Sequence, residues 1–532
     1  MEDCARATPY ARVHNAFTRL AQRRILACAV VFLFTVALRC ALLPWMPPPN
    51  PTIHDEFSYL LAADTYAHGR LTNPTPRLWE HFETFQELQR PTYASKYPVL
   101  QGLSLAFGEK FFSLPWIGVV LTSALMGAAL CWMLQGWISA EWALAGALCF
   151  AFRIGVLSYW MNSFEGGAVP AIGGALAFGA VARVGLRGEY RHAATWALGL
   201  SILMHSRPYD AAVLGLVTAI ALAGLLWREP RTRSFALPQA AIPAAVVFVV
   251  SLGAMTWIDL RVTGDALTLP YLAHDREYVA ASPFLFAALP PEPAYRHPVM
   301  RDFYTGAAVD IWKESRAQPV VQFLGRAYIV INFLFGAWPI AVIALLWPFV
   351  PTTREQRAGM AFAAAGFVSL APLAGVYPHY AAAFAPAFLL RFLQSLDRLG
   401  SWRGWWGRAA AGAVIAMFVL SGRDSFSTVL AERAAGFGAD RAAVVRRLTA
   451  LPGKQLVVVR YAPGHNPQNE WVFNAADIDG SKIVWAREMT AEEDRPLLDS
   501  YRDRQPWLLR ADRNPPQLEP YSSPETNRQA WR

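Results

Sequence analysis

The chain has 532 residues, of which 54% are hydrophobic and only 16% are charged. This composition excludes a disordered chain and argues against a water-soluble multidomain enzyme, because soluble domains carry about 25% charged residues. The net charge of +9 comes from 43 Arg and 5 Lys against 39 acidic residues, a balance that would also suit a nucleic-acid-binding protein.

Apolar runs long enough to cross a bilayer dominate the chain. About 20 apolar residues span the hydrocarbon core as a helix. The first run, residues 25–43, follows an arginine-rich segment and lacks a small-residue cleavage site, which indicates a retained span rather than a signal peptide. Ten further runs bring the expected number of spans to about 11: 115–134, 141–160, 167–183, 193–206, 209–227, 236–258, 325–349, 358–376, 380–396 and 409–422.

Basic residues divide the connecting segments into two groups. Cytoplasmic loops of membrane proteins are enriched in Lys and Arg. If segment 1–24 is cytoplasmic, the segments on that side carry 17 arginines, whereas the three short loops on the opposite side carry one basic residue, Arg207. The 17 are Arg6, Arg12, Arg19, Arg23, Arg24, Arg183, Arg187, Arg191, Arg228, Arg231, Arg233, Arg354, Arg357, Arg391, Arg398, Arg403 and Arg408. We therefore predict a cytoplasmic N-terminus, and no nucleic-acid partner is needed to explain the charge.

Three longer segments are expected on the outer side: 44–114, 259–324 and the tail, 424–532. The tail alternates short β-type runs with helix-like stretches, the former at 453–460, 482–485 and 507–509 and the latter at 438–450 and 490–503. Such alternation favours a small α/β domain with a partly parallel sheet. The predicted fold is therefore mainly α, a polytopic membrane helical bundle over residues 25–423 followed by a small extracytoplasmic α/β domain.

Two adjacent carboxylates open the first outer segment. Five prolines between residues 44 and 51 end the first span, and Asp55 and Glu56 follow at the start of an expected helix, flanked by His54 and Tyr59. A carboxylate just above the bilayer can act as a general base on an acceptor hydroxyl or amine. Alternatively, Asp55 only caps the helix and Glu56 complements its dipole.

A second stretch of this segment, residues 77–88, places Leu78, Phe82 and Phe85 on one helical face. Such a helix would lie flat in the membrane interface with its acidic residues toward water. His81 and Glu83 could bind a divalent cation together with His54 or Asp55, but the spacing is not specific to a metal site. No metal is firmly predicted, and a divalent cation stays open as a cofactor.

Cations and aromatic residues recur at the outer ends of other spans. Lys96, one of only five lysines, precedes the second span, and Arg207 opposes the charge trend of the short outer loops. Both could bind a lipid-linked phosphate, although Lys96 could instead extend to the headgroups and Arg207 could pair with Asp210. Glu165 lies in a loop whose next two residues are glycines, which permit close approach of backbone or ligand, or which form an ordinary turn.

These motifs resemble the GT-C glycosyltransferases, and within them the branch of protein O-mannosyltransferases and lipid A aminoarabinose transferases. The resemblance rests on the Asp55-Glu56 pair, Lys96-Tyr97-Pro98, Pro378-His379-Tyr380 and the following Ala-Pro-Ala-Phe-Leu-Leu, and it covers roughly residues 20–400. Residues 162–174, 206–209, 477–480 and 484–488 also look like stretches of bacterial membrane proteins grouped with this branch.

The resemblance implies a polyprenyl-phosphate sugar as donor and inverting transfer, but it does not carry over the acceptor. We expect the acceptor to be an envelope lipid, glycan or protein on the outer face of a bacterial inner membrane. The resemblance also implies that Asp55 activates the acceptor, that Glu56 orients the acceptor or the base, and that Lys96 lies near the donor phosphate. Arg207, His379 and Tyr380 would also contact the donor. The remaining polar residues of these segments are candidates for acceptor or sugar contacts: His54, Tyr59, His81, Glu83 and Glu165.

Two other functions remain open at this point. A transporter or flippase of envelope precursors could have the same number of spans, but such proteins commonly carry internal repeats and ionisable groups near the midplane. No repeat is visible here, and the main ionisable residues within spans are Arg39 and Arg153. A non-catalytic membrane scaffold would need none of the carboxylates described above.

Overall fold

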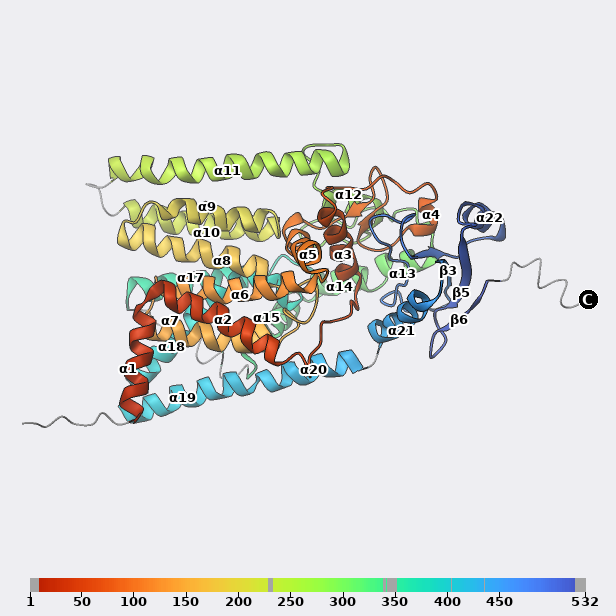
Figure 1. Ribbon diagram of the computed structural model, residues 1–532. Coiled ribbons are helices and arrows are strands. Elements are labelled where there is room, and N and C mark those ends of the chain that lie inside the picture. The colour runs from red at the N-terminus through yellow and green to blue at the C-terminus, as the bar shows by residue number, and fades with distance from the viewer. Residues whose placement is uncertain are drawn as a thin grey trace, which may run out of the picture.

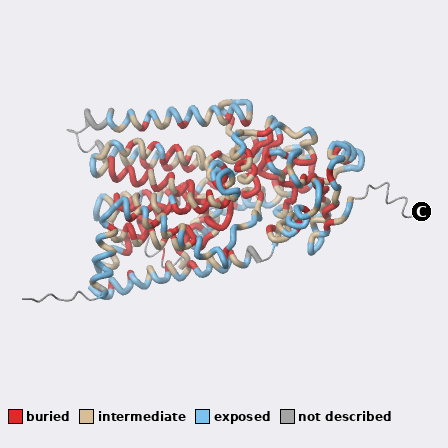
Figure 2. Tube along the Cα trace, viewed as in Figure 1, coloured by how far each residue is buried: buried red, intermediate tan, exposed pale blue. Residues whose placement is uncertain are grey.

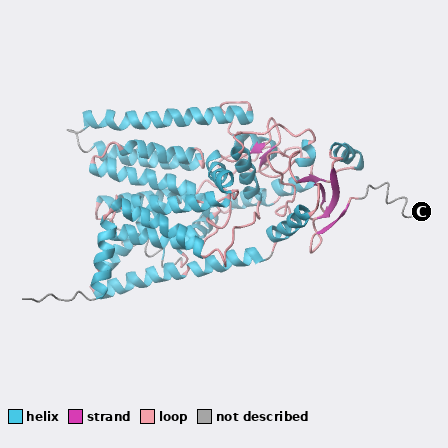
Figure 3. Ribbon diagram, viewed as in Figure 1, coloured by secondary structure: helices cyan, strands magenta, loops and turns pink. Residues whose placement is uncertain are grey.

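The computed structural model describes residues 9–227, 233–337, 341, 352–402, 404–434 and 436–521. A long helical bundle makes up most of the molecule, and a smaller part with strands lies at one end of it (Figure 1, Figure 3). The expected positions Arg6, Arg228, Arg231 and Arg403, and most of the second half of run 325–349, lie outside the described residues.

Each of the eleven apolar runs coincides with a helix. They are α2 Arg24–Ala41, α6 Trp116–Leu134, α7 Ala140–Phe150 continued by the π-helix η1 Ala151–Val156, α8 Ala168–Val181 continued by the π-helix η2 Ala182–Leu186, α9 His192–Met204, α10 Pro208–Trp227, α11 Arg233–Thr263, α15 Pro319–Phe335, α17 Arg354–Val368, α18 Ala385–Ser401 and α19 Trp405–Leu420. Within the described residues, six helices are both long and apolar enough to cross a membrane. The other runs form helices that are shorter or interrupted. These helices fall below the length needed to cross a membrane.

The outermost helices expose apolar side chains that water would not favour. On α11, Ile242, Val246, Val249 and Val250 are all more than half exposed and follow one helical face. Such a face is stable in contact with lipid, because the helix forms all of its backbone hydrogen bonds internally. Figure 2 shows the contrast between this exposed helix and the buried centre of the bundle. The chain is therefore an integral membrane protein.

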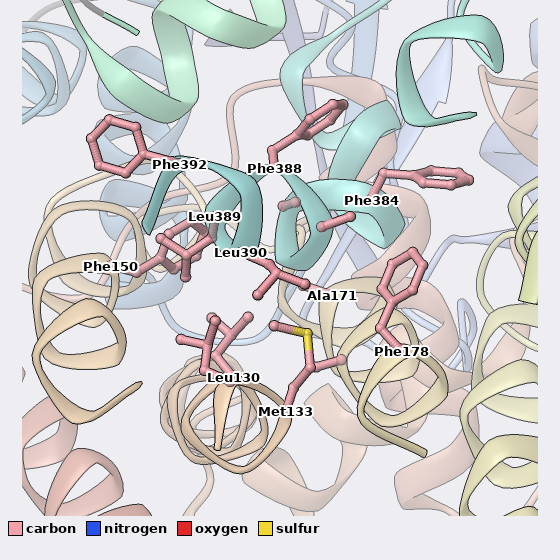
Figure 4. Packing of buried hydrophobic residues seen from close by; sticks show 14 of the residues in the cluster. Leu130, Met133, Phe150, Ala171, Phe178, Phe384, Phe388, Leu389, Leu390 and Phe392 are labelled. Atoms are coloured by element: carbon pink, nitrogen blue, oxygen red, sulfur yellow. The ribbon is translucent and has the colours of Figure 1, made fainter. Parts of the chain in front are cut away.

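The centre of the bundle is a core of large and small apolar side chains. Leu130 and Met133 on α6, Phe150 on α7 and Phe178 on α8 share this core with Phe384 of the 3-10 helix η3 Pro378–Phe384 and with Phe388 and Leu390 of α18 (Figure 4). Small residues let the backbones approach closely: a Cβ on Gly174 would lie 1.9 Å from the carbonyl oxygen of Ala383. This contact fixes η3, which carries two of the candidate site residues.

The arginine-rich connections lie at the end of the bundle away from the strands. The amphipathic helix α1 Pro9–Gln22, the end of η2 and the start of α19 meet there (Figure 1). The connections at the opposite end carry the acidic and aromatic motifs. The charge asymmetry seen in the sequence is thus an asymmetry between the two ends of the folded bundle.

The part with strands, at one end of the bundle, is built from the two long segments expected on the outer side and from the tail. The first outer segment forms α3 His54–Ala67, α4 Trp79–Phe82, the short pair β1 Glu87–Leu88 and β2 Ala94–Ser95, and α5 Val99–Phe112, and the second forms α12 Pro270–Tyr278, α13 Pro298–Thr305 and α14 Ala307–Ala317. The tail forms α20 Gly422–Ala434, α21 Phe437–Ala450, β3 Lys454–Arg460, β4 Ile483–Arg487, α22 Ala491–Ser500, β5 Arg504–Arg510 and β6 Gln517–Pro520.

The tail contains the predicted partly parallel sheet. Its strand order is β4-β3-β5-β6, in which β3 is parallel to both neighbours and β6 is antiparallel to β5. Val457 of β3 lies opposite Trp485 on one side and Trp507 on the other. The alternation of strands and helices in the sequence is confirmed, with β6 as an additional edge strand.

The tail and the first outer segment share one apolar core. Leu61, Phe82 and Tyr93 of the outer segment pack with Leu456 and Val458 of β3 and their neighbours. The prediction of a flat interfacial helix over residues 77–88 is therefore wrong. The tail covers this stretch, only four residues of it are helical, and Glu83 and Glu87 are buried rather than turned toward water.

Candidate functional site

Asp55 lies in the first turn of α3, where the chain returns from the proline-rich turn. Its carboxylate accepts a hydrogen bond from the hydroxyl of Tyr97, whose ring stacks on Tyr59 with centroids 4.5 Å apart. Burial raises the pKa of Asp55 above its usual range, and the positive charges of Lys96 and Arg207 oppose that rise. A carboxylate with a raised pKa, between two cations, is suited to taking up a proton.

Glu56, not Asp55, fixes the start of α3 through hydrogen bonds. One carboxylate oxygen accepts hydrogen bonds from the backbone N–H groups of Thr52 and Ile53 and from the Thr52 hydroxyl, at 2.7, 3.3 and 3.0 Å. The other accepts from the backbone N–H of Phe164 at 2.9 Å. Glu56 therefore joins α3 to the loop that carries Glu165, and both of its oxygens are already used.

Lys96 is buried next to Asp55, directly after β2. Its ammonium lies 4.5 Å from the ring centroid of Tyr271 and 5.4 Å from that of Tyr97. Burial lowers the pKa of Lys96, while Asp275 and Asp55 raise it. The side chain is 5% exposed, so its ammonium faces the site instead of extending to the headgroups.

Arg207, between α9 and α10, approaches the same site from the bundle. Its guanidinium lies 4.7 Å from the ring centroid of Tyr380 on η3. Among the described residues it forms no ion pair, and in particular none with Asp210. Its charge acts on Asp55, Glu165 and His379 as well as on Asp210, and no direct ion pair prevents it from binding an anionic ligand.

Glu165 and His379 form a polar wall beside these cations. The hydroxyl of Tyr159 accepts from the backbone N–H of His379 and lies 3.0 Å from its Nδ1, and Glu165 Oε1 lies 3.6 Å from the same nitrogen. Burial holds the pKa of His379 well below its usual range, so the ring is neutral.

The pKa of Glu165 is raised well above its usual range by burial and by the neighbouring charges of Asp55 and Glu56. The raised pKa favours the protonated form of Glu165, which can donate a hydrogen bond. The loop reaches this position through its glycines: Gly166 has a φ of +45°, and a Cβ on Gly167 would lie 2.3 Å from the Trp160 ring. The group that approaches Gly167 closely is the indole of Trp160.

A cavity of about 600 Å³ adjoins this wall. Glu56, Tyr159, Glu165 and Tyr377 line it on the site side, and residues of α15, α20 and α21 line it elsewhere. The structure thus brings together Asp55, Lys96, Arg207, Glu165, His379, Tyr380 and Tyr59, from five separate parts of the sequence, beside a cavity of substrate size.

Three of the predicted contact residues lie elsewhere, at the interface with the tail. His54 Nε2 lies 2.8 Å from the carbonyl oxygen of Pro467 and its ring stacks on Phe85. His81 Nδ1 lies 3.0 Å from the carbonyl of Arg487, and Glu83 accepts from the Tyr278 hydroxyl at 2.8 Å. Among the described residues, no group of three or more His, Cys, Asp or Glu side chains could bind a metal ion. We derive no step through a metal.

Four residues of the site were not expected from the sequence: Tyr97, Tyr159, Tyr271 and Asp275. Tyr271 and Asp275 lie four residues apart on α12, a helix of the second outer loop, so they share one face. The one signal in the sequence for these residues was that Tyr97 directly follows Lys96. Tyr159 and Tyr271 reach the site only through contacts between distant segments.

Comparisons with known proteins support the fold. No model of a protein family and no characterised protein sequence matches the chain. Among solved structures, it is similar to ArnT from Cupriavidus metallidurans bound to undecaprenyl phosphate, with a TM-score of 0.52 and 12% identity, over 90% of this chain and 92% of that one. The apo form of ArnT gives a TM-score of 0.49 at 11% identity and the same coverage.

The oligosaccharyltransferase of Archaeoglobus fulgidus, in its complex with zinc and sulfate, gives a TM-score of 0.46 at 13% identity. The match covers 82% of this chain but only 60% of that protein. The similarity to ArnT shows that the chain has the fold of the GT-C membrane glycosyltransferases, which confirms the fold predicted from the sequence.

Proposed function

We propose that the chain is a membrane glycosyltransferase that moves a sugar from a polyprenyl-phosphate donor to an envelope lipid, glycan or protein on the outer face of the bacterial inner membrane. The observation that carries the proposal is Asp55, a carboxylate in the first turn of α3 that interacts electrostatically with both Lys96 and Arg207. A base and two cations are the groups that transfer from a lipid phosphate requires. The solved ArnT complex with undecaprenyl phosphate supports a lipid-phosphate ligand for this fold.

The phosphate is the leaving group of the reaction. Lys96 and Arg207 hold it and stabilise the negative charge that develops as the glycosidic C–O bond breaks. The neutral imidazole of His379 and the hydroxyl of Tyr380 contribute hydrogen bonds without adding charge. Because the prenyl chain stays in lipid, these side chains need to reach only the headgroup at the outer surface.

Asp55 acts as the general base on the acceptor. Its carboxylate removes the proton of the acceptor hydroxyl or amine as that atom attacks the anomeric carbon on the face opposite the phosphate, which inverts the configuration. Tyr97 keeps the carboxylate in place through its hydrogen bond. Glu56 is a positioning residue, because its two oxygens fix the first turn of α3 and the neighbouring loop.

Mass spectrometry of envelope lipids and glycans tests the proposal directly. Cells that produce the wild-type chain should contain a glycosylated product that is absent from cells lacking the gene and from cells producing Asp55→Asn at equal membrane levels. Glu80→Gln, in the same outer segment but outside the site, is the matched control and should retain the product. An unchanged set of glycans and lipids in all of these cells would overturn the proposal.

A further inference from the structure

Asp275 on α12 is a carboxylate near Lys96 that takes no part in the proposed transfer. Lys96 interacts electrostatically with Asp275 and with Asp55 of α3, so two carboxylates from different outer segments act on one ammonium. One turn before Asp275, on the same face of α12, lies Tyr271, whose ring centroid is 4.5 Å from the Nζ of Lys96. This face of α12 is therefore packed against Lys96.

Neighbouring residues of α12 fix that face in place. His274 is buried, and its Nε2 lies 3.2 Å from the hydroxyl of Tyr304 on α13. The Nδ1 of the same ring lies 3.5 Å from the carboxylate of Asp275. Tyr278 donates to Glu83 of the first outer segment at 2.8 Å. These contacts hold α12 on both sides, so the position of Asp275 is set by the helix that carries it.

Lys96 needs a lasting counter-charge because it is buried. Its side chain is 5% exposed, and among the described residues its ammonium forms no hydrogen bond and no ion pair within contact distance. Burial lowers the pKa of Lys96, and the charges of Asp275 and Asp55 raise it. Because an ammonium binds phosphate far more strongly than a neutral amine, phosphate binding by Lys96 depends on these carboxylates.

The titratable and charged groups around Lys96 come from α3, α12, the bundle and Lys96's own segment. They are Asp55 and His54 on α3, Asp275, His274 and Tyr271 on α12, Tyr97 next to Lys96, and Arg207, which acts on Asp55 from the bundle. Burial lowers the pKa of both imidazoles to about 4. Neutral imidazoles leave the two carboxylates as the groups that maintain the charge of Lys96.

Asp55 cannot supply this counter-charge throughout the proposed reaction. As the general base it becomes neutral when it takes the proton of the acceptor, at the stage when the leaving phosphate gains negative charge. Lys96 is needed as an ammonium at that same stage. Asp275 takes up no proton in the step, so its carboxylate still faces Lys96 when Asp55 has been neutralised.

We propose that Asp275 is a positioning residue of the phosphate site, whose carboxylate keeps Lys96 in the ammonium form while Asp55 changes charge. The proposal rests on the proposed transferase function for the phosphate and for the role of Asp55, but its first test measures Lys96 alone. In this role Asp275 acts through Lys96 and does not contact the reacting atoms.

Competitive amine labelling measures the titration of Lys96 directly. The full chain in lipid vesicles is treated with a trace of acetic anhydride at a series of pH values, and mass spectrometry gives the rate at each lysine, since only the free amine reacts. Asp275→Asn should lower the pH midpoint of Lys96 labelling by about one unit, which raises its rate about tenfold at a fixed pH below both midpoints. The midpoint of Lys110, whose ammonium donates to the carbonyl of Ala67, should not change.

Asp275→Glu and Asp302→Asn are the matched controls. The first keeps the charge, and the second removes one from an exposed residue of α13 in the same loop, so both should keep the wild-type midpoint of Lys96. The plateau of the rate at high pH reports access to the amine. A higher plateau with an unshifted midpoint would show that Asp275 only packs α12 against Lys96. That result, or an equal shift in Asp302→Asn, would overturn the proposal.

Transfer gives a second and separate readout. Donor binding is lost as pH rises through the pKa of Lys96, so the KM for a polyprenyl-phosphate sugar should begin to rise about one pH unit lower in Asp275→Asn than in the wild type. A shifted midpoint in a chain that transfers no sugar would reject the transferase and support the control of Lys96 by Asp275. Transfer with an unshifted midpoint would reject only the role of Asp275.

Discussion

Replacing Asp55 by Asn removes one proton acceptor and leaves most of the surrounding structure in place. The amide oxygen can still accept the hydrogen bond from the Tyr97 hydroxyl, and the helix start is fixed by Glu56. The side chain loses its negative charge and its basicity. The variant therefore tests the chemistry of this position and not its packing.

The expected loss follows from the lack of a substitute base. Glu56 uses both oxygens for backbone N–H groups, and the raised pKa of Glu165 disfavours the ionised form that could accept a proton. A positioned general base contributes about 10²- to 10⁴-fold to a rate. We expect Asp55→Asn to lower turnover by that factor, equivalent to about 2.7–5.5 kcal/mol in the activation free energy.

The assay follows the release of polyprenyl phosphate from labelled polyprenyl-phosphate sugar in reconstituted vesicles, with expression and thermal unfolding as controls. The wild-type rate should fall as pH decreases through the raised pKa of Asp55, because the protonated carboxyl cannot accept a proton. The variant should lose this acidic limb. Turnover within about threefold of wild type, or an unchanged acidic limb, would refute the assignment of Asp55 as the base.

Four further variants test the cations, the positioning residue and the orientation. Lys96→Ala and Arg207→Ala should each raise the KM for the donor roughly ten- to hundredfold, because a hydrogen bond to a charged group contributes about 1.5–3 kcal/mol; an unchanged KM would exclude them from phosphate binding. Glu56→Ala should lower the free energy of unfolding by about 2–4 kcal/mol through four lost hydrogen bonds, measured by denaturation, whereas a wild-type value would show that water replaces them. Asn469→Cys in the tail should react with an impermeant thiol reagent in cells with a permeabilised outer barrier, and reaction only after lysis would reverse the proposed orientation.

The bundle could be predicted from the sequence because lipid imposes a simple rule. Every spanning helix needs a long apolar run, so the eleven runs identified their helices, and the strands of the tail followed from their alternation with helices. The stretch of residues 77–88 was mistaken because its apolar pattern fits two environments equally well. Phe82 and Phe85 could face lipid or another domain, and only the position of the tail decides between them.

The site could be predicted in part for a related reason. Asp55, Lys96 and Arg207 each stand out locally, as an acid after a proline turn, a rare lysine and an arginine against the charge trend. Tyr159, Tyr271 and Asp275 have no such local signal, because their roles come from contacts between segments far apart in the chain. Nor does the local sequence distinguish the roles of Glu56 and Asp55. Both oxygens of Glu56 accept hydrogen bonds, whereas the carboxylate of Asp55 interacts with the charges of two cations.

The position of the base depends on the tail as well as on the bundle. Asp64, in the last half of α3, accepts a hydrogen bond from the backbone N–H of Ala476 at 2.7 Å, and Leu61 packs in the core shared with β3. At the other end of the helix, burial lowers the pKa of His54 to about 4, so the neutral ring donates from Nε2 to the carbonyl of Pro467. The tail therefore holds α3 at both ends, while Glu56 holds its first turn to the bundle. Under the proposed function, the folded tail would therefore help to hold Asp55 in position.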